Sequence, residues 1–119
     1  MKKTLVLGAS PNPARVSHEA VGRLVNKGNE VVAIGVREGI IHGVPITKEL
    51  PQEEDIDTIT LYLNPKRQEQ YYDYILGLNP KRIIFNPGTE NYELAKMANE
   101  KGIETEMACT LVMLSLNQY

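Results

Sequence analysis

Short apolar segments alternate with amphipathic segments along the chain, and this alternation predicts a parallel sheet with crossover helices. Parallel strands that are buried on both faces have nearly continuous, β-branched apolar sequences. Four segments have this character and a weaker fifth follows: Thr4–Leu7, Glu30–Val36, Thr58–Leu63, Arg82–Phe85 and Ile103–Met107. Strands of this kind cannot be joined by tight hairpins, so the intervening segments are expected to cross over the sheet as helices.

Three helical patterns fill the intervals. The first, Ser17–Lys27, has an apolar stripe and is followed by Gly28, a residue suited to a left-handed helix stop. The second begins at Asn64, a capping residue, with Pro65 at the first helical position. The third covers about Glu90–Lys101, with Thr89 or Asn91 as its expected capping residue. The predicted fold class is therefore α/β: a three-layer, doubly wound, Rossmann-like parallel sheet of about five strands.

Two segments depart from this alternation of strands and helices. Glycines and prolines interrupt Glu38–Asp57, where only Val44–Ile46 has an extended pattern, and we expect a short edge strand, a loop and a helical turn near Lys48–Leu50. The apolar tail, Thr110–Tyr119, fits either a last short strand or a helix. This tail could close the core of the domain or form a contact in a homodimer.

Composition narrows the functional classes. The 119 residues fit one domain, 1–119, and the net charge of −2 with scattered Lys and Arg residues argues against nucleic-acid binding. A single cysteine, Cys109, cannot form an internal disulfide, and the N-terminal segment lacks the apolar core of a signal peptide. No apolar run approaches the ~20 residues of a membrane span. We expect a reduced, cytoplasmic protein that is not inserted in a membrane.

The junction after the first predicted strand is the strongest candidate site. A helix N-terminus offers unpaired backbone N–H groups and the positive end of the helix dipole to an anion. The residues of this turn that could hold phosphate are Gly8, Ala9, Ser10, Pro13, Arg15 and Ser17. The dinucleotide motif G-x-G-x-x-G is incomplete, because Ser10 and Pro13 occupy its second and third glycine positions. The turn therefore predicts a phosphate site that is not an ordinary NAD site, unless Arg15 extends into solvent and the turn is structural.

The second and third strand ends also carry cations. Val36 and Arg37 precede Glu38, and a cation before a carboxylate favours a phosphorylated ribose, as in NADP or coenzyme A, over NAD. A weak surface pair between Arg37 and Glu38 is the alternative. The turn formed by Asn64, Pro65 and Lys66 places cations in the first turn of a helix, where they oppose its dipole unless an anion is near. A solvated basic turn explains these residues equally well.

Catalytic machinery is not evident. His18 lies in the first turn of a predicted helix, His42 lies in the irregular segment without an identified partner, and Cys109 fits an inert buried thiol or a reactive one. No residue spacing is typical of a metal site or of a Ser-His-acid arrangement. Three tyrosines on one helix are expected to cover the sheet: Tyr71, Tyr72 and Tyr74.

Together these features resemble a family of small single-domain coenzyme A-binding proteins, whose fold is also that of the N-terminal domain of the succinyl-CoA synthetase alpha subunit. The segments that carry the resemblance are Gly8–His18, Gly43-Val44-Pro45, Asn64-Pro65-Lys66, Gly88-Thr89-Glu90-Asn91 and the run from Ala95 to Ile103. The resemblance implies that Ser10 and Arg15 hold a pyrophosphate. It also implies that the residues after the second strand meet the adenosine end, and that Asn64, Pro65 and Lys66 border the same pocket. This chain has Val36 where family members often have proline, and Ala108 where many have arginine.

The resulting hypothesis is a protein that binds coenzyme A or an acyl-CoA at the carboxyl edge of a parallel sheet, with no evident catalytic residue or metal ligand. An NADP-dependent, reductase-like nucleotide-binding protein is one alternative. A ligand-free scaffold or dimerisation domain is the other. In the first two cases the partner is a small-molecule nucleotide.

Overall fold

A single seven-stranded sheet forms the centre of the computed structural model, which describes all 119 residues. Its strand order is β3-β4-β2-β1-β5-β6-β7. Six strands run parallel and only β3 is antiparallel to its neighbour β4. The strands are β1 (Thr4–Leu7), β2 (Val31–Ile34), β3 (Gly39–Ile41), β4 (Val44–Thr47), β5 (Thr58–Leu61), β6 (Arg82–Phe85) and β7 (Glu104–Met107). The doubly wound α/β sheet is thus confirmed, with seven strands instead of about five.

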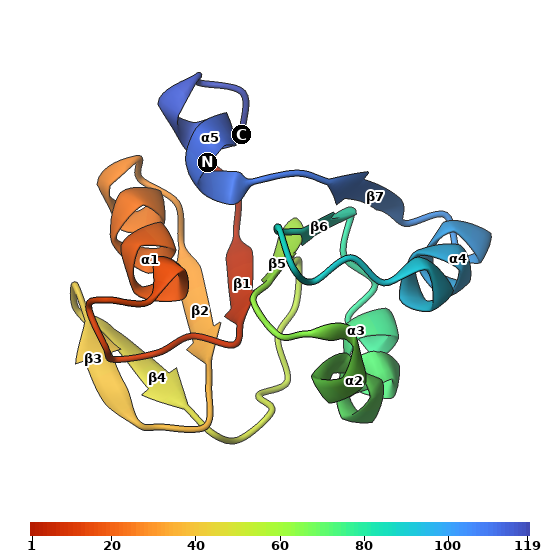
Figure 1. Ribbon diagram of the computed structural model, residues 1–119, viewed down its shortest axis with the longest axis horizontal. Coiled ribbons are helices and arrows are strands. Elements are labelled where there is room, and N and C mark those ends of the chain that lie inside the picture. The colour runs from red at the N-terminus through yellow and green to blue at the C-terminus, as the bar shows by residue number, and fades with distance from the viewer.

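Helices cover both faces of this sheet (Figure 1). They are α1 (Val16–Asn26), α2 (Pro65–Gln68), the 3-10 turn η1 (Glu69–Tyr71), α3 (Tyr72–Gly77), α4 (Tyr92–Glu100) and α5 (Thr110–Ser115). Side chains of a strand alternate between its faces. On β1, Val6 belongs to the core shared with α1 and α5, whereas Leu5 and Leu7 belong to the core shared with α3 and α4. None of these helices is long and apolar enough to cross a membrane.

The strand order reverses between β1 and β5. From β1 the chain moves outward through α1 to β2, and the next parallel strand, β4, continues in that direction. It then returns to the other side of β1 as β5 and continues outward through β6 and β7. The loops after β1 and β5 therefore diverge at the carboxyl edge, which in doubly wound sheets opens a crevice for ligands.

The segment between β2 and β5 differs from its prediction. The extended stretch at Val44–Ile46 is β4, and it lies inside the sheet against β2, while the unpredicted β3 takes the edge. His42 and Gly43 join the two strands with φ angles of 48° and 83°, which is typical of a tight hairpin turn. The helical turn predicted near Lys48–Leu50 is wrong: the backbone only bends there, and the Glu49 N–H donates to the Thr47 hydroxyl. The apolar tail, left open between strand and helix, forms α5.

Helix boundaries follow the predicted capping residues. Gly28 has a φ of 86°, as expected for a left-handed stop. The side chains of Asn64 and Asn91 accept hydrogen bonds from the first turns of α2 and α4. The second predicted helix is not continuous but consists of α2, η1 and α3 in succession. As predicted, its three tyrosines pack against the core.

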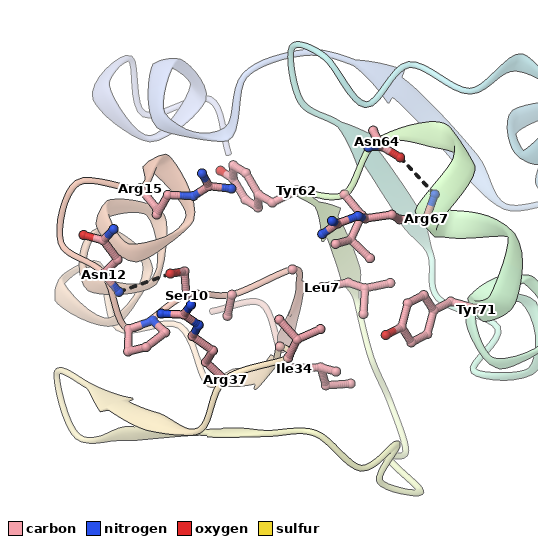
Figure 2. A pocket seen from close by; sticks show the side chains of 16 residues that line it. Leu7, Ser10, Asn12, Arg15, Ile34, Arg37, Tyr62, Asn64, Arg67 and Tyr71 are labelled. Atoms are coloured by element: carbon pink, nitrogen blue, oxygen red, sulfur yellow. Dashed lines mark hydrogen bonds between the residues drawn. The ribbon is translucent and has the colours of Figure 1, made fainter.

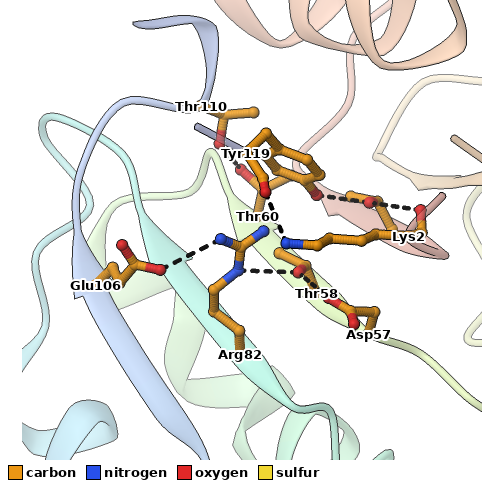
Figure 3. Close-up of polar contacts among 9 residues, drawn as sticks. Lys2, Asp57, Thr58, Thr60, Arg82, Glu106, Thr110 and Tyr119 are labelled. Carbon is orange, nitrogen blue, oxygen red and sulfur yellow. Dashed lines mark hydrogen bonds and ion pairs between the residues drawn. The ribbon is translucent and has the colours of Figure 1, made fainter. Parts of the chain in front are cut away.

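A buried arginine and the last residue of the chain fix α5 to the sheet (Figure 3). Arg82 is 8% exposed; its Nε donates to the Thr58 hydroxyl at 3.0 Å, and its Nη1 lies 3.3 Å from a carboxylate oxygen of Glu106. Its guanidinium also lies over the Tyr119 ring, 4.6 Å from the centroid. The Tyr119 hydroxyl is 2.6 Å from that of Thr4 on β1. A buried cation needs such partners, so these contacts hold the segment after α5 against β1 and β5.

Candidate functional site

A cavity of about 640 Å³ opens at the carboxyl edge of the sheet, where the strand order reverses (Figure 2). The loops after β1, β2 and β5 and the start of α2 form its walls. Its sixteen lining residues are Leu7, Gly8, Ala9, Ser10, Pro11, Asn12, Arg15, Ile34, Gly35, Val36, Arg37, Tyr62, Leu63, Asn64, Arg67 and Tyr71. Its size is within the usual range for small-molecule sites.

The cavity brings together most of the residues proposed from the sequence. Seven of the eleven line it: Gly8, Ala9, Ser10, Arg15, Val36, Arg37 and Asn64. Ser17 instead lines a smaller adjoining cleft, and Pro13, Pro65 and Lys66 line neither space. Pro65 is the first residue of α2, where it shapes the helix start that carries Asn64 and Arg67.

Sequence reasoning missed several lining residues. Arg67, not Lys66, is the cation of α2 that reaches the cavity. Tyr71 both packs on the core and lines the cavity, although the sequence suggested only the first of these roles. Tyr62 follows β5 directly, but the predicted strand Thr58–Leu63 included it, so the sequence did not mark it as a loop residue at a strand end.

Three guanidinium groups make this cavity strongly cationic. Arg15, Arg37 and Arg67 line it, and no Asp or Glu side chain does. None of the three arginines forms an ion pair within the protein, since the salt bridges involve only Lys3, Arg23 and Arg82. The chain as a whole carries a net charge of −2. A concentration of unpaired positive charge in a concave site on an acidic protein attracts anions and suits bidentate binding of phosphate.

The turn after β1 was expected to offer unpaired backbone N–H groups, but two of them are already hydrogen-bonded within the protein. The Gly8 and Ala9 N–H groups both donate to the Ile34 carbonyl at 2.9 Å, because the hydrogen bonding between β1 and β2 continues past the strand ends. These two amides are therefore not available to an anion. The N–H groups without a protein partner are those of Ser10, Val16 and Ser17.

A smaller cleft of about 260 Å³ adjoins the cavity at the N-terminus of α1. Gly8, Arg15 and Tyr62 line both spaces, and the cleft is completed by Ala14, Val16 and Ser17. Ser17 is only 4% exposed, and its hydroxyl makes no hydrogen bond within the protein. A hydroxyl and two unpaired amides thus line this cleft at the positive end of a helix, an arrangement that favours anions.

Local hydrogen bonds set the shape of the turn that carries Arg15. The Asn12 N–H donates to the Ser10 hydroxyl at 3.1 Å, and the Asn12 side chain accepts from the Ala14 N–H at 3.0 Å. Arg15 then takes the N-cap position of α1 with an extended backbone. Its side chain extends toward the Tyr62 ring across the mouth of the cavity (Figure 2).

Two glycines allow the walls of the cavity to approach one another. Gly8 has a φ of 99°, and a Cβ atom there would lie 2.9 Å from the Tyr62 carbonyl carbon. A Cβ atom on Gly35 would overlap the carbonyl oxygen of Ala9. The loop after β2, which carries Arg37, can therefore lie directly against the turn after β1 only because Gly35 has no side chain.

A buried glutamine fixes the opposite wall. Gln68 is fully buried in α2, and its amide donates to the Leu63 carbonyl at 2.7 Å and the Thr89 carbonyl at 2.8 Å. Its side-chain oxygen accepts from Asn91, the capping residue of α4. These bonds satisfy the buried amide and anchor the loop between β5 and α2, and with it the position of Arg67.

Tyr62 is the most perturbed titratable group of the site. Burial raises the pKa of its phenol to about 12, and the neighbouring hydroxyls of Thr60 and Thr110 partly oppose this rise. The Thr60 and Thr110 hydroxyls lie 2.8 Å from each other, and the Asn86 side chain also donates to the Thr60 hydroxyl. These hydroxyls therefore bond mainly to each other and to Asn86, and not to the phenol. The Tyr62 hydroxyl is therefore buried without a hydrogen-bond partner.

Replacing Tyr62 with phenylalanine is expected to change stability little at pH 7, because the lost hydroxyl makes no hydrogen bond. Above pH 10 the unfolded chain loses the phenolic proton while the folded chain retains it up to about pH 12, so the free energy of unfolding of the native protein falls with rising pH. Tyr62→Phe should flatten this decline in denaturant titrations between pH 9 and 11. An identical decline in the variant would contradict the shifted pKa.

The cavity lining is rich in hydrogen-bond donors. Its lining offers guanidinium, hydroxyl, phenol and amide groups, but no histidine, cysteine or carboxylate. His18, His42 and Cys109 all lie outside it. No group of three or more His, Cys, Asp and Glu side chains could hold a metal ion. The cavity thus combines three cationic side chains with neutral hydrogen-bonding and apolar groups.

Comparisons with known proteins show the fold and the family of the chain. The chain is similar to a crystal structure described as that of an uncharacterized protein, at 50% identity and a TM-score of 0.97, covering 100% of this chain and 98% of the other. A hypothetical protein from Pyrococcus horikoshii OT3 is 25% identical with a TM-score of 0.86, covering 97% and 82%. A conserved hypothetical protein from Pyrococcus furiosus is 26% identical with a TM-score of 0.81, covering 94% and 98%.

No curated protein matches the chain. The family model described as the CoA binding domain matches residues 2–115, nearly the whole length. This match includes every element that lines the cavity and the adjoining cleft. The chain belongs to the CoA binding domain family.

Proposed function

We propose that this protein binds coenzyme A or an acyl-CoA in the cavity at the carboxyl edge of its sheet. The observation that carries the proposal is the set of three unpaired arginines in a cavity without a carboxylate. Coenzyme A carries a diphosphate and a separate ribose phosphate, so it presents anionic groups at two places along one molecule. Membership of the CoA binding domain family supports the same ligand.

The diphosphate would lie between the loop after β1 and the loop after β5, which form two walls of the cavity where the strand order reverses. Arg15 stands on one wall and Arg67 on the other, and the free Ser10 N–H lies in the turn between β1 and α1. The Ser17 hydroxyl and the free amides of α1 offer further donors in the adjoining cleft. Guanidinium groups and a helix N-terminus are both suited to binding phosphate oxygens.

The nucleoside would lie toward the end of β2. Arg37 follows Gly35 and Val36 there, in the position where a doubly wound fold meets the ribose and where a phosphorylated ribose calls for a cation. Leu7, Ile34 and Leu63 supply the apolar lining against which a base can pack. The proposal is one of binding, in which the chain's own residues orient and hold the ligand.

Calorimetric titration with coenzyme A, acetyl-CoA, dephospho-CoA, NADPH and NAD tests the proposal. We expect both CoA thiol and thioester to bind, and dephospho-CoA, which lacks the ribose phosphate, to bind at least ~10-fold more weakly because one charge-assisted contact is lost. NAD should give no response. Matched thermal-shift measurements report the same preferences, since a ligand of the native state raises Tm.

Two other outcomes of these titrations would favour the reductase-like protein or the scaffold. Tighter binding of NADPH than of coenzyme A would contradict the proposal and favour a reductase-like nucleotide protein. No response to any nucleotide, together with a dimer in sedimentation, would contradict it in favour of a scaffold.

A further inference from the structure

The two histidines of the chain converge on one another although they are far apart in sequence. His18 lies in the first turn of α1, and His42 lies at the tip of the hairpin between β3 and β4. Their ring centroids are 6.1 Å apart, with the ring planes tilted by 58°. Neither residue lines the cavity described above, so the proposed ligand site does not account for this pair.

The backbone around His42 is shaped to place its ring against α1. His42 has a φ of 48° in the hairpin turn, which directs the tip of the hairpin onto the helix. A Cβ atom on Gly22 would lie 2.6 Å from the Nε2 atom of His42, so the ring rests on the helix backbone where a side chain is missing. Gly22 follows His18 by four residues and therefore shares its helix face. The glycine thus gives the second imidazole its place beside the first.

Both imidazoles have unused lone pairs. No hydrogen bond or ion pair within the protein involves either side chain. His18 is half-buried and His42 is exposed, so both residues are open to solvent in part, with the Nε2 edge of His42 against Gly22. Neutral imidazole is the commonest protein ligand for transition-metal ions, and the two rings come from two different elements of a packed core.

The separation of the rings is close to that required by a shared ion. With metal–nitrogen bonds of about 2.0–2.1 Å and tetrahedral angles, two imidazoles on one ion place their centroids ~5 Å apart. An approach of ~1 Å from the observed separation is needed, which small changes of the side-chain torsions can supply. No third His, Cys, Asp or Glu joins the pair, so water completes the coordination.

We propose that His18 and His42 form a two-histidine site for a borderline divalent transition-metal ion such as Cu²⁺, Ni²⁺ or Zn²⁺. Imidazole nitrogen selects these ions over Mg²⁺ and Ca²⁺, which require oxygen ligands. The bound ion cross-links α1 to the β3–β4 hairpin. It therefore stabilises the edge of the sheet at which β3 is held only by β4 and by contacts with α1.

The test compares metal binding by the full chain and by variants that keep the local backbone. His42→Asn retains a residue that tolerates a positive φ, and His18→Gln retains a helix former. Cys109→Ser serves as the matched control, because it removes the only thiol of the chain. Each variant is titrated with Zn²⁺ and Ni²⁺ in a non-chelating buffer, and Tm is recorded with and without the ion.

We expect one equivalent of Zn²⁺ or Ni²⁺ per chain and a metal-dependent rise in Tm in the native protein and in Cys109→Ser. Either histidine substitution alone should weaken binding at least ~10-fold and remove the rise in Tm, since each imidazole raises the effective concentration of the other. The electron paramagnetic resonance spectrum of the Cu²⁺ complex should show coupling to two imidazole nitrogens. Unchanged metal affinity in the single variants, or coupling to one imidazole only, overturns the proposal.

Discussion

Arg15→Ala is expected to weaken binding of coenzyme A by ~1.5–3 kcal/mol, which is a 10- to 150-fold rise in Kd. Arg15 is the one cation that lines both the cavity and the adjoining cleft, so its loss removes charge from both spaces. Its guanidinium has no ion-pair partner in the protein that would compete with a phosphate. Calorimetric titration at constant salt measures the change.

Two further variants separate the role of Arg15 from a general charge effect. Arg23 lies on the same helix, but it pairs with Glu19 at 3.0 Å and lines neither space. Arg23→Ala makes the same change in net charge and should leave the affinity within twofold. Arg15→Lys should recover only part of the loss, because lysine lacks the planar fork that binds phosphate in a bidentate manner. Equal Kd values for native protein and Arg15→Ala would refute this role.

Gly35→Ala is expected to destabilise the fold by ~1–3 kcal/mol and to weaken coenzyme A binding as well. The new methyl group would overlap the carbonyl oxygen of Ala9, which is backbone and cannot rotate away. Relief requires the loop after β2 to move from the turn after β1. That movement displaces Arg37 from the cavity and disturbs the bonds by which Gly8 and Ala9 donate to Ile34.

The same substitution at another glycine gives the control. Gly77 is the last residue of α3, and a Cβ atom there would meet nothing within 4 Å. Gly77→Ala should therefore leave stability unchanged or raise it slightly, because alanine restricts the unfolded chain more than glycine does. Denaturant unfolding and titration of both variants measure the difference. A Gly35→Ala protein as stable as Gly77→Ala would show that the two walls are not in tight contact.

The parallel core of the fold could be predicted because its signals are local. Short segments rich in apolar and β-branched residues identify β1, β5 and β6, which are buried along their whole length. The helix stops and caps at Gly28, Asn64 and Asn91 depend on the residue itself and its nearest neighbours along the chain. Helix and strand boundaries set by such residues agree to within a few positions.

The β3–β4 hairpin could not be predicted because contacts with other elements of the fold stabilise it, and its own sequence does not. β4 contains Pro45 and only one fully buried residue, Ile46, and it forms a strand by pairing with β2. β3 is three residues long and is held at the sheet edge by β4 and α1. The tail that forms α5 was equally ambiguous, because the core that Leu114 enters is provided only by the folded sheet, while Val112 and Leu116 stay exposed.

Most of the residues proposed from the sequence line one cavity, but the sequence did not indicate its detailed contacts. Arg15 and Arg37 were identified because they follow strand ends, which converge at one edge in a parallel sheet. The choice of Arg67 over Lys66 depends on the rotation of α2, which the sequence does not define. Whether the Gly8 and Ala9 N–H groups are hydrogen-bonded depends on how far the pairing of β1 with β2 extends past the strand ends.

A crystal structure of the protein with coenzyme A tests the central claim most directly. The account predicts phosphate oxygens within ~2.7–3.1 Å of Arg15 and of at least one of Arg37 and Arg67, at the carboxyl edge between β1 and β5. A ligand bound elsewhere on the surface, with the three guanidinium groups facing solvent, would contradict it.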